Sequence, residues 1–300
     1  MLDLDLPQSG ASPASAQDWL ATQEKLRGDY RGCGADFSIV QDLSAYTKDE
    51  HRLWQQLFRR QSEVAQRYAA KAFLDGMHNL DMSPDRIPDF EDASKRLRAL
   101  TGWEIVAVPG LIPDDAFFSH LAHRRFPVTV WIREPHEIDY LVEPDVFHDF
   151  FGHVPLLTQP IFADYLQAYG AKGAEAMRLG ATKILARVFW YMVEFGLIRE
   201  NGEIKAYGAG MLSSATETAF SVDSPKPHRV MFDLARVMGT DFRIDDFQST
   251  YFVLDRFDDL FAAMNQPFAP LYAALKTAAP IPATELRPGD QVINRGHLSA

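Results

Sequence analysis

The sequence contains little cysteine, fewer basic than acidic residues, and no long apolar run. Cys33 is the only cysteine among 300 residues, so no intramolecular disulfide can form, and a zinc site built from several thiolates is excluded. The 30 basic residues are outnumbered by 41 acidic ones, which gives a net charge of -11. Because general nucleic-acid binders neutralise phosphates with basic patches, we expect small-molecule partners and no nucleic acid.

The sequence also lacks the usual signs of targeting or membrane insertion. Residues 1–16 are acidic and rich in Pro, Ser and Ala, unlike a secretory signal or an Arg-rich transit peptide. The longest apolar stretch, Ile184–Ile198, is shorter than the roughly 18 residues that span a membrane, and it contains Arg187 and Glu194. These observations predict a cytoplasmic protein that makes no membrane contact.

Apolar periodicity predicts a single catalytic domain that is mainly α-helical with minor β structure. Helical spacing runs through residues 47–73 and again from near Asp89 to Leu100, after which Gly102 is a stop signal. Asp114 or Asp115 is expected to cap a further short helix. The strands that we expect share a β-branched composition: Val106–Pro109, Val128–Ile132 and Ile204–Tyr207.

The two ends of the chain differ in composition from the segment between them. Residues 1–17 are punctuated by Pro, Ser and Gly and are expected to form a flexible tail. Residues 287–300 show no sustained helical pattern and are expected to form a C-terminal tail without a tetramerisation helix. The predicted catalytic domain therefore spans residues 18–286.

His148 and His153 lie five residues apart among aromatic and aliphatic neighbours. On an ideal α-helix this spacing places two side chains about 140° apart and about 7.5 Å apart along the axis. Two ligands of one ion, each about 2.1 Å from it, must lie much closer. The pair can share an ion only if the helix ends or deforms between them, and Gly152 and Pro155 would permit an ending. The spacing alone is equally compatible with two core histidines.

Glu194 is the candidate for a third ligand. It lies in an apolar helical segment, where a buried carboxylate is costly unless it is paired or bound to a metal. Arg187 is two turns away, an awkward distance for a partner, although Glu194 can also point outward. Two histidines and one carboxylate form the facial triad of non-haem Fe(II) enzymes that use O2. A catalytic zinc can use the same three ligands, but the His-Glu-x-x-His pattern of zinc proteases is absent.

Three segments, in the same order and spacing, resemble the pterin-dependent aromatic amino acid hydroxylases: Glu143–Leu156, Phe189–Leu197 and Ile204–Ser214. The resemblance extends from about Gly102 to Leu254, and the length is similar to that of the compact bacterial phenylalanine 4-hydroxylases. It implies a monomeric phenylalanine 4-monooxygenase that converts L-phenylalanine to L-tyrosine with O2, non-haem Fe(II) and a tetrahydropterin.

The resemblance also implies roles for individual residues. The iron ligands would be His148, His153 and Glu194. Arg133 would bind the substrate carboxylate and Asp145 would hold it, since a guanidinium fork suits a carboxylate. The other implied residues are Phe147, Tyr140, Trp190 and Ser213 around the substrate, with Ser213 also orienting His148, and Gly110, Leu111, Ile112, Phe117 and Glu143 around the pterin; Glu143 and Ser213 are the implied catalytic groups.

Three other hypotheses stay open at this point. Tryptophan is the nearest alternative substrate within the family. A zinc hydrolase would use the same His/His/Glu ligands, with Asp149 or Glu143 as the general base. A non-catalytic binding protein for aromatic amino acids would hold a structural metal or none.

Overall fold

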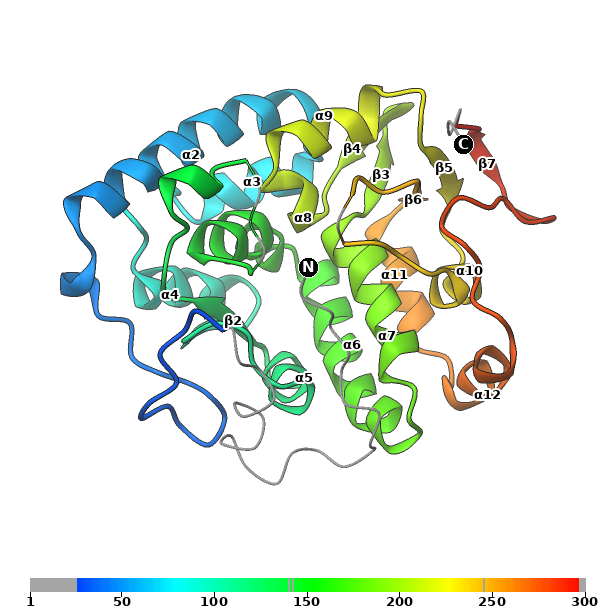
Figure 1. The fold of residues 1–300 in the computed structure, drawn as a ribbon, viewed down its shortest axis with the longest axis horizontal. Coiled ribbons are helices and arrows are strands. Elements are labelled where there is room, and N and C mark those ends of the chain that lie inside the picture. Colours follow the sequence, from blue (N-terminus) through cyan, green and yellow to red (C-terminus); the bar gives the residue numbers. More distant parts are fainter. Residues whose placement is uncertain (1–25, 140, 142, 245, 297–300) are drawn as a thin grey trace.

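The computed structural model describes residues 26–139, 141, 143–244 and 246–296, and this part of the chain is mainly helical (Figure 1). The helices are α2 (Lys48–Tyr68), α3 (Lys71–Asn79), α4 (Phe90–Leu100), α5 (Asp114–Ala122), α6 (Pro160–Arg178), α7 (Thr182–Phe189), α8 (Ala209–Leu212), α9 (Ala215–Asp223), α10 (Leu234–Gly239), α11 (Phe257–Met264) and α12 (Ala269–Thr277). The predicted tail at residues 1–17 lies outside the described residues.

Local sequence signals account for the first helices. Thr47 caps α2 in a reciprocal arrangement with Glu50, which satisfies free N–H groups at the helix start. The sequence predicts one helical pattern over residues 47–73, but the structure divides it into two helices. The backbone is extended at Ala69 and Ala70, between the end of α2 and the start of α3. Asp89 caps α4, and Gly102 follows that helix with a positive φ, as predicted.

The prediction that Asp114 or Asp115 caps α5 is wrong. Pro113 occupies the cap position and Asp114 is the first helical residue. An Asp in the first turn still interacts favourably with the positive end of the helix dipole.

The strands form two separate sheets. β1 (Glu104–Val108) and β2 (Arg125–Thr129) pair in parallel, and β2 lies three residues earlier than predicted. The larger sheet has the order β4-β3-β6-β5-β7. Its strands are β3 (Leu197–Glu200), β4 (Glu203–Ala206), β5 (His228–Met231), β6 (Thr250–Leu254) and β7 (Val292–Asn294). The segment expected to be a C-terminal tail thus contributes an edge strand, β7, which pairs antiparallel with β5.

One continuous apolar core connects α2 at one end of the described chain with α12 near the other. Figure 1 shows α6 and α7 through the middle, with α2, α3 and α4 on one side and the larger sheet, α10 and α12 on the other. Within the described residues, no helix is both long enough and apolar enough to cross a membrane. The helical turns that position the candidate site lie in the middle of this core.

Candidate metal centre

The two histidines of the predicted pair meet because the helix between them widens. Residues Phe147–His153 form a π-helix, η3, a wider turn whose typical backbone hydrogen bond joins residues five apart. A spacing of five therefore returns to nearly the same face, and His148 Nε2 lies 3.3 Å from His153 Nε2. The helix deforms, as required, but it does not end at Gly152; a 3-10 turn, η4 (Val154–Thr158), continues directly after it.

Gly152 has a different role from the expected helix stop. A Cβ added at Gly152 would lie 2.9 Å from the carbonyl oxygen of Ala209, the first residue of α8. Only a residue without a side chain allows η3 and α8 to pack this closely. Because α8 leads into Ser213, this contact sets the distance between the histidine pair and that serine.

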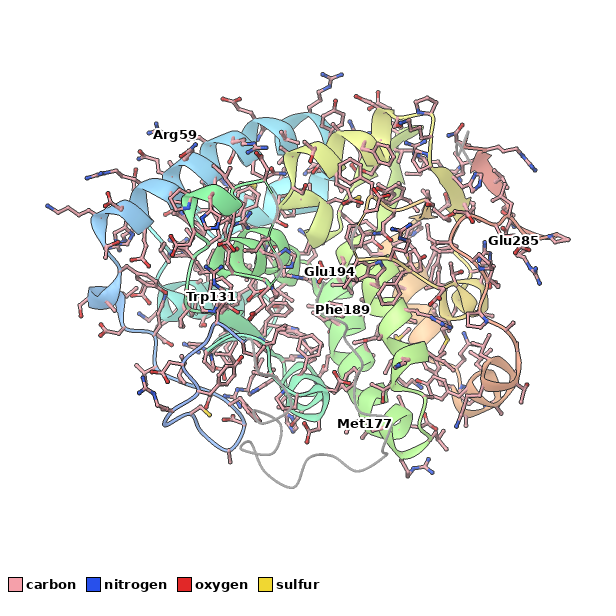
Figure 2. The ribbon with its side chains drawn as sticks, in the orientation of Figure 1. Arg59, Trp131, Met177, Phe189, Glu194 and Glu285 are labelled. Atoms are coloured by element: carbon pink, nitrogen blue, oxygen red, sulfur yellow. The ribbon has the colours of Figure 1, made fainter. Side chains whose placement is uncertain are left out.

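Glu194 completes the cluster from a second π-helical segment, η5 (Trp190–Glu194). Its Oε1 lies 3.2 Å from His153 Nε2, and its Oε2 lies 3.6 Å from His148 Nε2. Glu194 therefore points inward (Figure 2). Arg187 is not its partner, because that guanidinium bonds to the Met238 carbonyl and pairs with Asp241.

The donor atoms have the separations that a shared metal ion requires. Ligands about 2.1 Å from one ion and about 90–110° apart lie roughly 3.0–3.4 Å from each other, close to the distances among the three side chains. Glu194 Oε2 is buried and makes no hydrogen bond in the described part of the chain. A buried oxygen without a partner is costly, and a bound cation would satisfy it.

The charge states of this cluster favour a cation. Burial opposes ionisation of Glu194, but the two imidazoles outweigh it and lower the pKa of its carboxyl. Burial likewise favours neutral His148, yet the Glu194 carboxylate raises the pKa of that imidazole. The Glu194 carboxylate thus favours a positive charge beside it, and a metal ion can supply that charge.

Ser213 lies within hydrogen-bond distance of the first histidine. His148 Nδ1 lies 2.8 Å from Ser213 Oγ, and Ser213 Oγ lies 3.4 Å from the Gly210 carbonyl oxygen. If the serine donates to that carbonyl, His148 Nδ1–H donates to Oγ and leaves Nε2 with a free lone pair. Such a hydrogen bond fixes both the tautomer and the ring angle of a metal ligand.

Asp149, which the sequence suggests only as the general base of a hydrolase, also lies beside the two histidines. Its carboxylate and the two histidines have ligand atoms within 4.8 Å of one another. Asp149 Oδ2 accepts a hydrogen bond of 2.8 Å from the Thr129 backbone N–H, and burial raises the pKa of its carboxyl. Its position between His148 and His153 in the sequence is the feature that could have identified Asp149 as part of the site.

Arg133 and Asp145 form the predicted ion pair. Arg133 Nε and Nη2 donate to the two oxygens of Asp145 at 2.9 Å each, and the Arg133 backbone N–H also donates to Asp145 Oδ2. Asp145 Oδ1 further accepts from the His148 backbone N–H at 2.9 Å. Asp145, which is fully buried, therefore joins the arginine to the start of η3.

Aromatic rings surround the cluster unequally. The ring of His153 packs against those of Phe126 and Phe189, with centroid distances of 5.0 and 6.0 Å. Phe189, next to Glu194 in Figure 2, is a site residue that the sequence analysis missed although it lies in a quoted motif. Phe147 is fully buried, and the Arg133 guanidinium lies over its ring at 5.6 Å.

Trp190, at the start of η5, is half-buried. Its ring stacks on Phe242 at 4.5 Å and packs against Phe195 at 4.7 Å. Its indole N–H donates to Gln248 Oε1 at 3.0 Å. Tyr140, the remaining predicted substrate residue, lies outside the described residues.

One of the predicted pterin residues, Phe117, is linked to the metal cluster through ring contacts. The ring of Phe117 packs edge-on against Phe189 at 5.3 Å, and Phe189 in turn packs against His153. Leu111 and Ile112 are half-buried beside Tyr30, and the Leu111 carbonyl accepts a hydrogen bond from Tyr30 Oη. Glu143 is only 4% exposed, and burial raises the pKa of its carboxyl.

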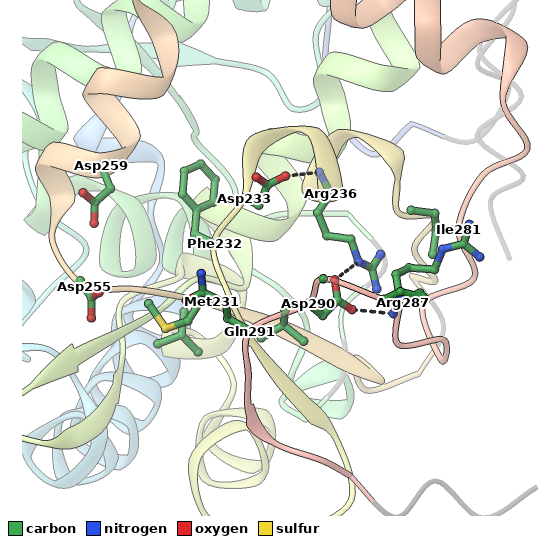
Figure 3. A pocket seen from close by; sticks show the side chains of 14 residues that line it. Met231, Phe232, Asp233, Arg236, Asp255, Asp259, Ile281, Arg287, Asp290 and Gln291 are labelled. Carbon is green, nitrogen blue, oxygen red and sulfur yellow. Dashed lines mark hydrogen bonds and ion pairs between the residues drawn. The ribbon is translucent and has the colours of Figure 1, made fainter.

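A cavity of about 590 Å³ lies elsewhere, between α10 and residues 287–291 (Figure 3). Its lining contains none of the predicted site residues. The charged groups in it are engaged in holding the fold: Asp233 caps α10, Asp259 takes part in the cap of α11, and Arg236 pairs with Asp290 at 3.0 Å. We therefore assign it no ligand.

Comparisons with known proteins match most of the chain. A sequence model of the biopterin-dependent aromatic amino acid hydroxylases matches residues 25–275. The phenylalanine-4-hydroxylase of Chromobacterium violaceum is 54% identical over 261 residues, 87% of this chain and 88% of that protein. The phenylalanine-4-hydroxylase of Ralstonia nicotianae is 50% identical, covering 87% of this chain and 83% of that protein.

Solved structures match equally well. The crystal structure of phenylalanine hydroxylase from C. violaceum bound to cobalt has a TM-score of 0.85 and 51% identity, covering 91% of this chain and 98% of that chain. The mainly helical fold with minor sheets that the sequence predicts is therefore confirmed.

Proposed function

Because this chain belongs to the family of biopterin-dependent aromatic amino acid hydroxylases, we propose that His148, His153 and Glu194 hold an Fe(II) ion beside a bound tetrahydropterin. The activity is that of a pterin-dependent phenylalanine 4-hydroxylase, which converts L-phenylalanine to L-tyrosine. The observation that supports the metal assignment is the cluster itself, in which two π-helical segments bring one carboxylate and two imidazoles within 3.2–3.6 Å of one another.

When bound, Fe(II) and a tetrahydropterin together supply the electrons that activate O2. The protein supplies position and charge. A facial triad leaves three metal positions open, which suits a reaction that brings O2 and an organic substrate to one side of the ion. Ser213 holds the ring of His148 for this purpose.

Arg133 is suited to bind the carboxylate of the amino acid. A guanidinium has five N–H donors, and Asp145 uses two of them, one on Nε and one on Nη2. The Ile138 carbonyl lies 3.4 Å from Nη1. One donor on Nη1 and one on Nη2 remain, and this edge of the fork can bind a carboxylate through two parallel hydrogen bonds.

Asp145 connects substrate binding to the metal ligands. It accepts hydrogen bonds from Arg133 and from the His148 backbone, so the two groups keep a fixed separation. Holding the amino acid at one end orients its ring relative to the metal, and such positioning accounts for much of the rate in bimolecular reactions. Trp190 and Phe147 then serve as part of the aromatic surroundings of the ring.

The pterin is proposed to bind at the loop formed by Gly110, Leu111 and Ile112, with its ring against Phe117. Backbone groups of this loop suit the polar edge of a pterin, and an aromatic ring suits its face. Glu143 is proposed as the acidic group on this side of the site. Its buried carboxyl, with a raised pKa, can hold a proton at higher pH than an exposed one.

The alternatives of the sequence analysis receive less support. Family membership and the phenylalanine-specific names of several relatives weigh against a zinc hydrolase and against tryptophan as the main substrate. We further propose that the protein works as a cytoplasmic monomer, as the resemblance to the compact bacterial phenylalanine 4-hydroxylases implies. Light scattering of the purified protein tests this, and a stable dimer would contradict it.

Metal exchange tests the assignment of iron. Metal-free protein is loaded with Fe(II) or Zn(II) to equal occupancy, and product is assayed with L-phenylalanine, O2 and tetrahydrobiopterin. We expect tyrosine from the Fe(II) form and none from the Zn(II) form. Equal tyrosine formation by both would contradict a redox role for the metal.

A further inference from the structure

A short segment near the start of the described chain, residues 26–30, lies across the predicted pterin loop. Tyr30 Oη donates a hydrogen bond of 2.7 Å to the carbonyl of Leu111. A Cβ added at Gly28 would lie 2.2 Å from the carbonyl oxygen of Pro109, so the two backbones are in direct contact. The segment and the loop thus form one packed unit, although they are about 80 residues apart in sequence.

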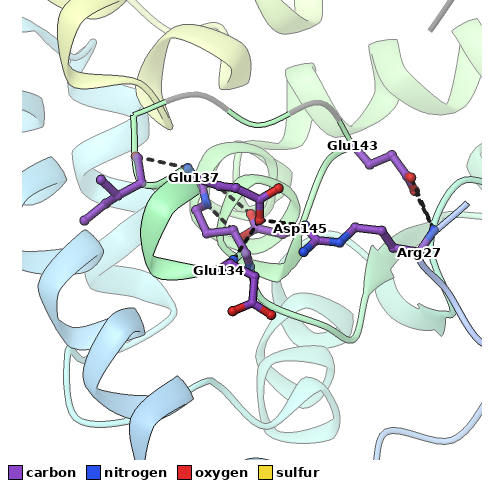
Figure 4. A network of polar contacts seen from close by, with 7 residues as sticks. Arg27, Glu134, Glu137, Glu143 and Asp145 are labelled. Atoms are coloured by element: carbon purple, nitrogen blue, oxygen red, sulfur yellow. Dashed lines mark hydrogen bonds and ion pairs between the residues drawn. The ribbon is translucent and has the colours of Figure 1, made fainter. Parts of the chain in front are cut away.

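Arg27 extends this unit to Glu143. Its backbone N–H lies 3.2 and 3.4 Å from the two carboxylate oxygens of Glu143 (Figure 4). Its side chain pairs with Glu137 at 2.7 Å and lies over the ring of Trp131 at 4.8 Å. The Trp131 indole N–H in turn donates to the carbonyl of Pro109 at 3.1 Å. Arg27 therefore contacts Glu143 directly and the loop through Trp131.

We propose that residues 26–30 form a clamp that holds the predicted pterin loop and Glu143 in their binding arrangement, with Arg27 and Tyr30 as positioning residues for the tetrahydropterin. This inference rests on the proposed function, because that function places the pterin at the loop. A loop fixed before its ligand arrives loses less conformational freedom on binding, and affinity rises accordingly.

The contacts explain why a clamp is needed here. The loop at Gly110–Ile112 presents backbone groups, and a flexible loop presents them in many arrangements. Glu143 is nearly buried, and the Arg27 N–H is a donor to its carboxylate, so displacement of the segment leaves that carboxylate with one donor fewer in a buried place. Both effects act on pterin binding and leave the ligands of the metal untouched.

Two substitutions, Tyr30→Phe and Arg27→Ala, remove side-chain contacts of the clamp. Tyr30→Phe keeps the ring and removes the hydroxyl that bonds to Leu111. Arg27→Ala removes the pair with Glu137 and the contact with Trp131, and Arg27→Lys restores charge without a planar group to stack on the ring. Arg31→Ala is the matched control, because the Arg31 side chain pairs with Asp29 at the surface and is 90% exposed.

The binding measurement uses metal-loaded protein and 7,8-dihydrobiopterin, a non-reducing pterin, in isothermal titration calorimetry. We expect Tyr30→Phe and Arg27→Ala to raise its dissociation constant about three- to tenfold, the loss of one typical hydrogen bond. Arg27→Lys should fall between Arg27→Ala and the unmodified protein, and Arg31→Ala should match the unmodified protein. Steady-state assays should show a similar rise in KM for tetrahydrobiopterin, with KM for L-phenylalanine changed less than about twofold.

The outcomes separate the clamp from the proposed function. A lower melting temperature with an unchanged pterin dissociation constant would show that the segment only stabilises the fold, and it would overturn the clamp. Equal rises in both KM values would also overturn it. If the unmodified protein binds the dihydropterin but forms no tyrosine, the proposed reaction fails while the binding comparison still tests the clamp.

Discussion

His148 and His153 present their Nε2 atoms 3.3 Å apart although five residues separate them, because a π-helical turn joins them. A second π-helical turn presents Glu194 to the same point. Single π turns are rare in proteins overall, but they occur frequently at functional sites. They change which side chains share a face of the helix. Both segments that supply candidate metal ligands here use this device.

Replacing Glu194 by Ala should abolish tight metal binding and leave the fold intact. The side chain lies at the centre of the cluster and supplies its negative charge. We expect metal affinity to fall by more than the roughly 10- to 100-fold typical of losing an outer hydrogen-bond partner of a ligand. Metal content after dialysis and the melting temperature are the two measurements. Glu203→Ala, at the exposed start of β4, is the control, and retained metal in Glu194→Ala would contradict the assignment.

Adjacent serines should separate metal binding from helix stability. Ser213→Ala removes the hydrogen bond to His148 Nδ1, so metal affinity should fall about 10- to 100-fold with little change in stability. Ser214→Ala removes the side-chain cap of α9, so stability should fall by about 1 kcal/mol with little change in metal affinity. Metal titration and urea unfolding of both variants check the pair. The reverse pattern would contradict the proposed role of Ser213.

Arg133→Lys should mainly weaken binding of the amino acid. A lysine cannot reproduce the two bonds to Asp145 while it offers a second pair to a carboxylate. We expect KM for L-phenylalanine to rise about tenfold or more, with a smaller change in kcat. Arg199→Lys, which alters a surface pair with Asp255, is the control. An unchanged KM would mean that another residue binds the carboxylate.

Glu217 should make stability fall as pH rises. Burial raises the pKa of Glu217 from 4.5 to about 7, against the opposing hydrogen bonds from the Gln248 backbone and Tyr251. The folded protein therefore holds this proton more tightly than the unfolded chain, and between pH 4.5 and 7 the contribution to stability decreases with rising pH.

Glu217→Gln should remove that decrease. The free energy of unfolding is measured by urea denaturation at pH 4.5 and at pH 7. Its decrease between these two pH values should be about 3 kcal/mol smaller in the variant than in the unmodified protein. Glu203→Gln, at an exposed position, is the control and should follow the unmodified protein. Identical pH dependence in Glu217→Gln and the unmodified protein would mean that Glu217 ionises normally.

Much of the fold was predictable because its signals are local. Asp89 before an apolar pattern and Gly102 after it bound α4 correctly, since capping and positive φ depend on residue type. The break between α2 and α3 was not predictable from periodicity, because it depends on a long-range bond from the Ala70 N–H to the Ala206 carbonyl. β7 was missed for a similar reason, since pairing with β5 defines it.

The sequence predicts which residues form the candidate site better than it predicts how they are arranged. The sequence required a deformation between His148 and His153, but its residues do not distinguish a helix end from a π turn. The role of Gly152 depends on the approach of Ala209, more than 50 residues away, which no local pattern contains. The contribution of Arg27 was missed because its contact with Glu143 uses a backbone N–H, which every residue except proline has.

The origin of the oxygen atom in the product tests the proposed reaction most sharply. Purified protein loaded with Fe(II) is incubated with L-phenylalanine, tetrahydrobiopterin and isotopically labelled dioxygen, and the tyrosine is analysed by mass spectrometry, with iron and pterin omitted in turn. We expect tyrosine that carries one labelled oxygen from the complete mixture, and none from either omission. Unlabelled tyrosine, or tyrosine formed equally without iron or pterin, would contradict the proposed iron- and pterin-dependent monooxygenase.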